Sequence, residues 1–200
     1  FDLTGFGRLP LLANGRMKPI DTVARNSLLL FQGRQTVTTP AGQSITPTEW
    51  LLDVFFHSDA ADKYRTFEIV HPDLLALLTL NAEDGDGKKR FSYAEIAKKI
   101  PELERQARLA GPIDSAVRTP FQKAVIQLYG ALVHYQRLKH TLAPPTTDDF
   151  LAELLRFQKL LPTGIAAVRA KQAGQPHDEE TAKAMIELGQ RYLFMSETTN

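Results

Sequence analysis

The residue types that could do chemistry gather in one short segment of the chain, residues 9–25. It holds three cations, Arg16, Lys18 and Arg25, close to the Asn14-Gly15 dipeptide. Arg16 and Lys18 precede an expected helix N-terminus, where the helix dipole disfavours positive charge, so their position requires another explanation. Guanidinium and ammonium groups bind carboxylates and phosphates. The segment therefore predicts either an anion-binding corner or a solvated turn with an internal ion pair.

The elements that would position this corner follow from the same residues. Asn-Gly is a tight-turn dipeptide, and the residue before a proline is kept extended, which applies to Lys18 before Pro19. A helix is expected directly afterwards, with Asp21 as its cap and Arg25 one turn further on as the ion-pair partner of Asp21. The candidate binding residues are Gly15, Arg16, Lys18, Pro19, Asp21, Thr22 and Arg25.

The rest of the N-terminal half predicts a small α+β unit. Thr46-Pro47-Thr48-Glu49 combines an N-cap residue, a proline in the first turn and an acid three residues after the cap. The expected elements are a hairpin of 35–39 with 43–45, a capped helix over 49–57 with Trp50, Leu51 and Val54 inward, a short strand around 67–69 and a helix over 73–80.

The C-terminal half predicts helices. A second capping box at 92–95 opens a short helix that should end before Pro101, and a helix of about six turns follows Thr119, with His134 on its solvated or partner-facing side. Pro144-Pro145 then breaks the chain, and helices over 148–161 and 178–195 flank a segment punctuated by Gly and Pro. We expect a mainly α fold with a small β element (α+β), and a C-terminal half like a helical bundle. The units would be 1–90 and 91–200, or one compact domain.

The composition excludes several function classes. The chain has no cysteine, which removes disulfides, thiolate metal sites and a thiol nucleophile. The 24 basic and 23 acidic residues give no overall field for nucleic acid. No apolar run is long enough to span a bilayer, and no signal-peptide pattern is present. The composition fits a soluble part of a larger protein.

Metal and catalytic patterns are weak. Asp84, Asp86 and Glu95 match three positions of a calcium-binding loop, but Lys88 and Lys89 replace a ligand and the turn glycine, so we expect a turn without calcium. Each of the five histidines stands without a paired ligand in the sequence. No Ser-His-Asp order, paired-carboxylate motif or phosphate loop appears, so no catalytic or metal residue is assigned. A hydrolase that uses Asp73, Glu95 or His71 is the least favoured of three functional hypotheses.

The string GRMKPIDTVARNSLLLFQGRQT, followed by a short hairpin-like run and then TPTEWLLDVF, resembles the extracytoplasmic domain of CcsA/ResC-type cytochrome c biogenesis proteins, in particular their large fused forms. Residues 9–34 and 49–52 carry this match. The remaining residues resemble it in layout. Members of this family carry heme across the membrane and help to attach it to apocytochrome c, with a tryptophan-rich loop and histidines near the membrane. This chain has one tryptophan, Trp50, so the resemblance places the heme-handling part elsewhere in the full-length protein.

The resemblance implies a periplasmic domain at the outer face of the bacterial inner membrane, acting in heme delivery or apocytochrome docking during cytochrome c assembly. Its partners would be the rest of its own membrane protein, apocytochrome c or other assembly factors, and heme, which is the cofactor of the full-length protein. Arg16, Lys18 and Arg25 would then contact an acidic surface or heme propionates. The alternative is a structural spacer or protein-interaction domain that has no heme contact.

Overall fold

The computed structural model describes residues 1–198 except 14, 82, 84–86, 88 and 143–149. Its contacts divide the chain into two compact units, Phe1–Leu138 (unit 1) and Lys139–Asn200 (unit 2). The boundary that we expected near residue 90 falls inside unit 1, where a strand at 65–68 pairs with one at 90–92. The fold is mainly α with small two-stranded antiparallel sheets, which confirms the expected class.

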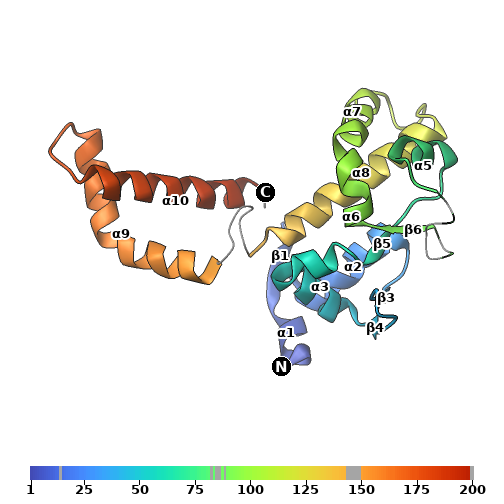
Figure 1. Cartoon of the computed structure of the whole chain (residues 1–200), viewed down its shortest axis with the longest axis horizontal. Helices are drawn as coiled ribbons and strands as arrows, with labels where there is room; N and C mark the ends of the chain where they lie inside the picture. Colours follow the sequence, from blue (N-terminus) through green and yellow to red (C-terminus); the bar gives the residue numbers. More distant parts are fainter. Residues whose placement is uncertain (14, 82, 84–86, 88, 143–149, 199–200) are drawn as a thin grey trace. The chain divides into compact units, whose positions relative to one another are not determined.

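The elements of unit 1 follow one another along the chain as Figure 1 shows. In order they are α1 (Leu3–Arg8), β1 (Pro10–Ala13), β2 (Arg16–Pro19), α2 (Ile20–Gln32), β3 (Val37–Thr38), β4 (Ser44–Ile45), α3 (Pro47–Phe56), α4 (Ser58–Ala61), β5 (Arg65–Glu68), α5 (Pro72–Leu78), β6 (Arg90–Ser92), α6 (Tyr93–Ile96), the 3-10 turn η1 (Ala97–Lys99), α7 (Ile100–Ala110) and α8 (Pro120–Lys139). The expected hairpin is present as β3 and β4, in antiparallel register.

The core of unit 1 forms around Phe31 of α2. Its ring lies 6.0 Å from the ring of Trp50 in α3, 5.1 Å from Phe67 in β5 and 6.2 Å from Tyr135 in α8. All four side chains are buried, and Leu51 and Val54 are also fully buried, as expected. Burial of large aromatic and aliphatic side chains is the main stabilising term of such a domain. These contacts explain why α2, α3, β5 and α8 pack together although they lie far apart in the sequence.

Two expected helix starts are confirmed and one cap is wrong. Thr46 and Glu49 form the capping box of α3, and Ser92 and Glu95 form that of α6. The helix after Pro19 begins at Ile20, so Asp21 lies inside its first turn instead of before it. The N-cap position is held by Pro19, whose side chain has no acceptor, so no side-chain cap hydrogen bond forms at this end.

The helix α7 was not expected. The pattern after the capping box at 92–95 predicts a helix that ends before Pro101, but Pro101 occupies the first turn of α7. A proline is tolerated there because its missing N–H would have no partner within the helix. The buried positions Leu103, Ala107 and Ala110 show that α7 contributes its own apolar side chains to unit 1.

Of the two environments expected for His134, solvated or facing a partner, the solvated one is wrong, because the side chain is half-buried. The imidazole of His134 contacts Ser27 Oγ through Nε2 at 2.8 Å, and its ring lies 5.6 Å from the ring of Phe31. Both residues belong to α2. The side of α8 that carries His134 therefore packs against α2.

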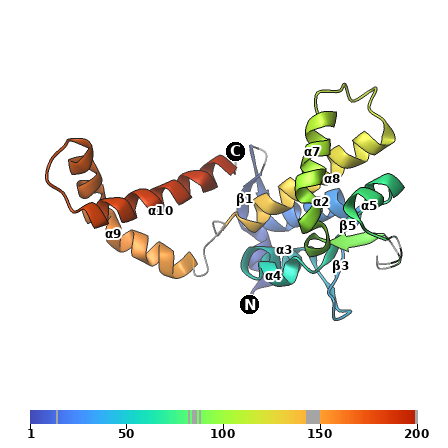
Figure 2. The same ribbon diagram turned by 45° about the horizontal axis from the view of Figure 1, so that its top comes forward.

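Unit 2 contains α9 (Phe150–Gln172) and α10 (Glu179–Thr198). The expected end of the first helix at residue 161 is wrong, because α9 continues through Pro162. A proline removes one helical hydrogen bond, and packing against a neighbouring helix can retain the helix around it. Gly164 provides such a contact, since a Cβ there would lie 3.0 Å from Met185 of α10. The ribbon of α9 changes direction along its length (Figures 1 and 2). Pro144-Pro145 lies outside the described residues.

Candidate functional site

The residues of the candidate corner form a β-hairpin and the start of α2. β1 and β2 pair in antiparallel register, with Leu12 opposite Met17 and Pro10 opposite Pro19. The amide of Ile20 donates to the carbonyl of Leu9 at 3.0 Å and closes the base of the hairpin. The hairpin is therefore joined directly to the first residue of α2.

The turn of this hairpin depends on a glycine. Gly15 has φ of 71°, in the left-handed region, and a Cβ built there would meet nothing within 4 Å. The backbone conformation, and not lack of space, therefore requires glycine at this position. Asn14 lies outside the described residues.

One face of the hairpin is apolar and exposed. Side chains alternate between the two faces of a strand, so Pro10, Leu12, Met17 and Pro19 share a face. We call these four residues the apolar hairpin face. All are exposed, and the large side chains of Leu12 and Met17 are 66% and 63% accessible. Large exposed apolar groups that lie directly opposite each other are a typical feature of contact surfaces.

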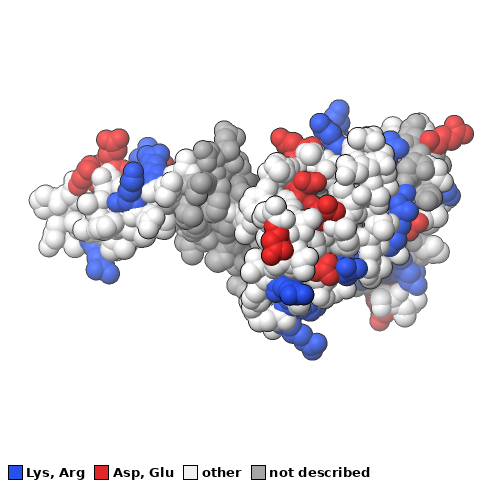
Figure 3. Space-filling view, turned by 90° about the horizontal axis from the view of Figure 1, so that it is seen from below, with Lys and Arg blue, Asp and Glu red and all other residues white. Residues whose placement is uncertain are grey.

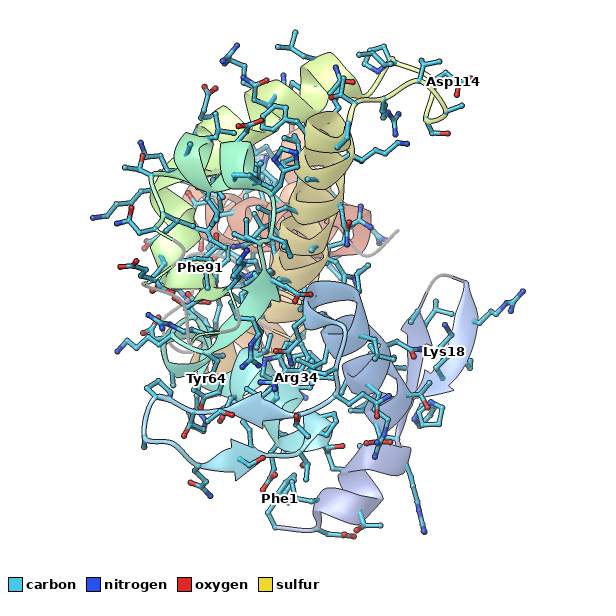
Figure 4. All side chains as sticks on the ribbon, turned by 90° about the vertical axis from the view of Figure 1, so that its right-hand side faces the viewer. Phe1, Lys18, Arg34, Tyr64, Phe91 and Asp114 are labelled. Atoms are coloured by element: carbon cyan, nitrogen blue, oxygen red, sulfur yellow. The ribbon has the colours of Figure 1, made fainter. Side chains whose placement is uncertain are left out.

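The opposite face of the hairpin carries two cations of the motif. Arg16 is exposed and pairs in register with Ala13, while Lys18 is half-buried and pairs with Leu11. Figure 4 shows Lys18 on the hairpin, which projects from the body of unit 1. In the described part of the chain, neither cation makes a hydrogen bond or ion pair that would occupy it.

Asp21 and Arg25 have a different environment. Arg25 Nε donates to Asp21 Oδ2 at 2.6 Å and Arg25 Nη1 donates to Gln35 Oε1 at 3.1 Å. Thr48 Oγ1 donates to Asp21 Oδ1 at 3.0 Å. The group therefore joins the first turns of α2 to α3 and to the segment that precedes β3. The expected ion pair of Asp21 with Arg25 is confirmed.

The electrostatics of the two residues follow from these contacts. The hydrogen bond from Arg25 lowers the pKa of the Asp21 carboxyl, against the opposing effect of partial burial, and the hydrogen bond from Thr48 lowers it further. The same bond raises the pKa of Arg25. Because the charges of Asp21 and Arg25 compensate each other, Arg25 does not form one cationic cluster with Arg16 and Lys18. Thr22 is half-buried in the same turn of α2.

The histidines do not assemble a metal centre. Among the described residues, no group of three or more His, Asp and Glu side chains could hold a metal ion. His57 contacts Asp53, His134 contacts Ser27, and His177 contacts Glu179. The Nδ1 atom of His71 is buried without a hydrogen-bond partner among the described residues.

The fit of heme was tested on two cavities of unit 1. A groove of about 420 Å³ contains His71 and a mainly apolar wall, but the only charged side chain of its lining is Glu68. The second cavity, which we call the basic cavity, is lined by Arg34, Thr38, Thr39, Pro40, Lys63, Arg65, Arg90, Ser92, Ala94 and Glu95. It has cations for propionates, but its described lining contains no histidine, and Pro40 and Ala94 are its apolar residues. A resident heme would need an iron ligand such as histidine and cations for its propionates in the same site. Neither cavity combines the two among its described residues, so neither fits a resident heme.

The sequence contains a signal for the hairpin beyond that of a turn. An Asn-Gly dipeptide between apolar residues is a strong hairpin signature, and it would have predicted that β1 and β2 pair. The basic cavity has no such signal, because its cations come from separate segments of the chain.

The distribution of charge over the described residues adds no candidate of its own. On the face that Figure 3 shows, basic and acidic side chains are interspersed, consistent with a net charge of +1. Across the described helices, none combines the length and apolar character that crossing a bilayer requires. Comparison with protein-family models, curated proteins and solved structures finds no match to this chain.

Proposed function

We propose that the chain is an extracytoplasmic docking domain of a membrane-bound cytochrome c assembly protein, and that the apolar hairpin face contacts apocytochrome c. The observation that supports this proposal is the exposure of Leu12 and Met17, opposite each other on a short hairpin. The family resemblance rests on residues 9–34 and 49–52, which include most of this hairpin.

The hairpin is suited to docking because it is held in place before any partner binds. The backbone bond from Ile20 to Leu9 fixes its base, and the contacts of Asp21 with Arg25 and Thr48 fix the start of α2. A contact surface that is already ordered loses little conformational entropy on binding. The apolar hairpin face would supply buried contact area.

Arg16 and Lys18 would act on the rate of encounter. Arg16 is exposed and Lys18 is half-buried, and cations near a contact surface attract an acidic partner and raise the association rate, with an effect that weakens in salt. Heme transfer is assigned to the remainder of the full-length protein, because neither tested cavity fits a resident heme. The chain would position apocytochrome c for that step.

The proposal can be tested in the intact membrane protein by measuring the yield of mature cytochrome c in cells. We expect Leu12→Ser combined with Met17→Ser to reduce the yield at least several-fold, because the substitutions remove apolar contact area while the hairpin register is retained. The matched control is Leu109→Ser with Val117→Ser, since these side chains are similarly exposed, at 61% and 72%. The control should leave the yield unchanged. Equal yields for both double variants at equal protein levels would exclude the docking role.

A heme titration of the chain separates docking from direct heme binding. We expect no saturable change in the Soret band. Saturable binding that weakens in Arg16→Ala and Lys18→Ala would contradict the assignment of heme transfer to the rest of the protein, and would place heme recognition on the hairpin.

A further inference from the structure

The basic cavity of unit 1 holds an excess of positive charge. Its volume is about 800 Å³, and its described lining contains four cationic side chains and one carboxylate, that of Glu95. Like charges repel, so a cavity that gathers them is stabilised by a bound anion. Three of the four cations are arginines, whose planar guanidinium groups bind phosphate and carboxylate through two parallel hydrogen bonds.

The cations come from three separate stretches of the chain, around residues 34, 63–65 and 90. Arg34 follows the C-terminal end of α2, Lys63 follows α4, and Arg65 and Arg90 lie in the paired strands β5 and β6. Figure 4 places Arg34 within the body of unit 1, away from the hairpin that carries Lys18. The basic cavity is therefore distinct from the apolar hairpin face.

The one lining carboxylate is already engaged by other donors. Glu95 Oε2 accepts from the amide and the hydroxyl of Ser92, each at 2.7 Å, in the capping box of α6. Glu95 Oε1 accepts from Arg65 Nη2 at 2.9 Å. Glu95 thus orients Arg65 at the wall of the cavity, and it makes no hydrogen bond to Arg34 or Lys63.

The loop that carries Arg34 is built into the core. Gln32 is buried, and its Nε2 donates to the carbonyl oxygens of Arg34 and Thr36 at 3.3 and 2.9 Å. Gln32 Oε1 accepts from Arg90 Nη1 at 3.2 Å. One side chain therefore positions both Arg34 and Arg90.

Arg34 also has an unused donor. Its Nε is buried and has no hydrogen-bond partner among the described residues. Buried polar groups in native proteins are normally hydrogen-bonded, and an exception at a cavity wall indicates a site for a missing acceptor. The oxygen of an anionic group in the cavity would be such an acceptor.

We propose that the basic cavity binds a small polyanion, a molecule that carries two or more phosphate or carboxylate groups. Two of the lining cations, Arg34 and Lys63, make no ion pair among the described residues, which leaves two positive charges for two anionic groups of one ligand. Of the described lining residues, Pro40 and Ala94 are apolar. This proposal uses none of the residues of the apolar hairpin face, so it does not depend on the docking function.

The test is a calorimetric titration of the full chain with pyrophosphate and, separately, with citrate at low salt. We expect saturable one-to-one binding of at least one of them. Arg34→Gln and Lys63→Gln should each weaken that binding at least tenfold. Arg34→Lys should weaken it less than Arg34→Gln, because lysine keeps the positive charge but cannot form the two parallel hydrogen bonds of a guanidinium group. Tighter binding of pyrophosphate would identify a phosphate-bearing ligand, and tighter binding of citrate a polycarboxylate.

The controls are Lys123→Gln and Lys159→Gln, which remove exposed cations elsewhere. They should leave the affinity unchanged. Lys63 is exposed, so its variant is expected to fold even where an Arg34 variant does not. The absence of saturable binding for both anions, or an equal loss of affinity in the control variants, would overturn the proposal.

Discussion

At the scale of single residues, the motif at 9–25 separates into two groups. Asp21 and Arg25 form an ion pair, and they also hydrogen-bond to Thr48 and Gln35 respectively. Their role is therefore to hold the start of α2 against neighbouring segments. Arg16 and Lys18 lie on the hairpin without such partners among the described residues. Sequence spacing cannot make this distinction, because Thr48 and Gln35 reach the motif only through the packing of α3 and the return of the chain after α2.

His134 gives the stability of unit 1 a dependence on pH. Burial against α2, and secondarily the charge of Arg137, lowers the pKa of His134 below its ordinary value of 6.5. As the pH falls through 6.5, the unfolded chain therefore binds a proton before the folded chain does. The contribution of neutral His134 is complete above this pH and is lost as the pH falls through the folded-state pKa.

We expect the melting temperature of unit 1 to fall between pH 7 and pH 5, and to fall less in His134→Gln, which can still hydrogen-bond to Ser27. Fluorescence of Trp50, the only tryptophan, reports on unit 1. His177 in unit 2 has a raised pKa and the opposite sign, and it lies outside this readout. Identical pH profiles for the two proteins would exclude His134 as the origin.

At the scale of elements, helix ends decide where the candidate residues lie. The C-cap of α2 is Gly33, with φ of 66°. This left-handed residue ends the helix, and Arg34 is the first residue after it. The two capping boxes place Thr48 at the start of α3 and engage Glu95 at the start of α6. Helix caps that depend on local sequence thus position Thr48, which contacts the start of α2, and Glu95 and Arg34 at the basic cavity. Contacts between distant segments complete both sites.

Two glycines allow the cap of α2 to be tested with a matched pair. A Cβ would meet nothing within 4 Å at either Gly33 or Gly130, so the substitutions differ mainly in backbone conformation. We expect Gly33→Ala to lower the free energy of unfolding by about 1 kcal/mol, since it forces alanine into the left-handed region. Gly130→Ala in α8 should raise it by about 0.5–1 kcal/mol. Urea denaturation followed by Trp50 fluorescence measures both, and equal signs would contradict the assignment.

At the scale of the whole chain, the two units differ in how much apolar surface they bury. Most of the buried apolar side chains in the described part belong to unit 1, whereas those of unit 2 are Ala167, Ala182 and Leu188. Both proposed sites lie within unit 1. Its stability should therefore not require the C-terminal helices.

We expect a chain of residues 1–142 to unfold cooperatively in urea with the same midpoint as the full chain, as followed by Trp50 fluorescence. The reason is that residues 1–138 form the core around Phe31 and Trp50. A full-length chain carrying Leu188→Ser serves as a companion variant, since it perturbs unit 2 without shortening the chain. A midpoint that falls markedly in the truncated chain would show that unit 1 depends on unit 2.

The sequence predicted the fold class, the β3–β4 hairpin, both capping boxes and the inward side chains of α3, because these features depend on local spacing. It failed where tertiary packing decides. His134 is half-buried because α2 lies against α8, and α9 continues through Pro162 where the sequence suggested a stop. The basic cavity could not be found at all, since three stretches of the chain bring its cations together only in the folded state.

Pro162 also determines how unit 2 should open. Because proline has no amide hydrogen, the carbonyl of Gln158 lacks its usual helical partner in the middle of α9. Water can reach this point of the backbone without fraying from either end. The amide hydrogens of α9 should therefore exchange with solvent as two separate stretches, so that α9 opens from its interior as well as from its ends.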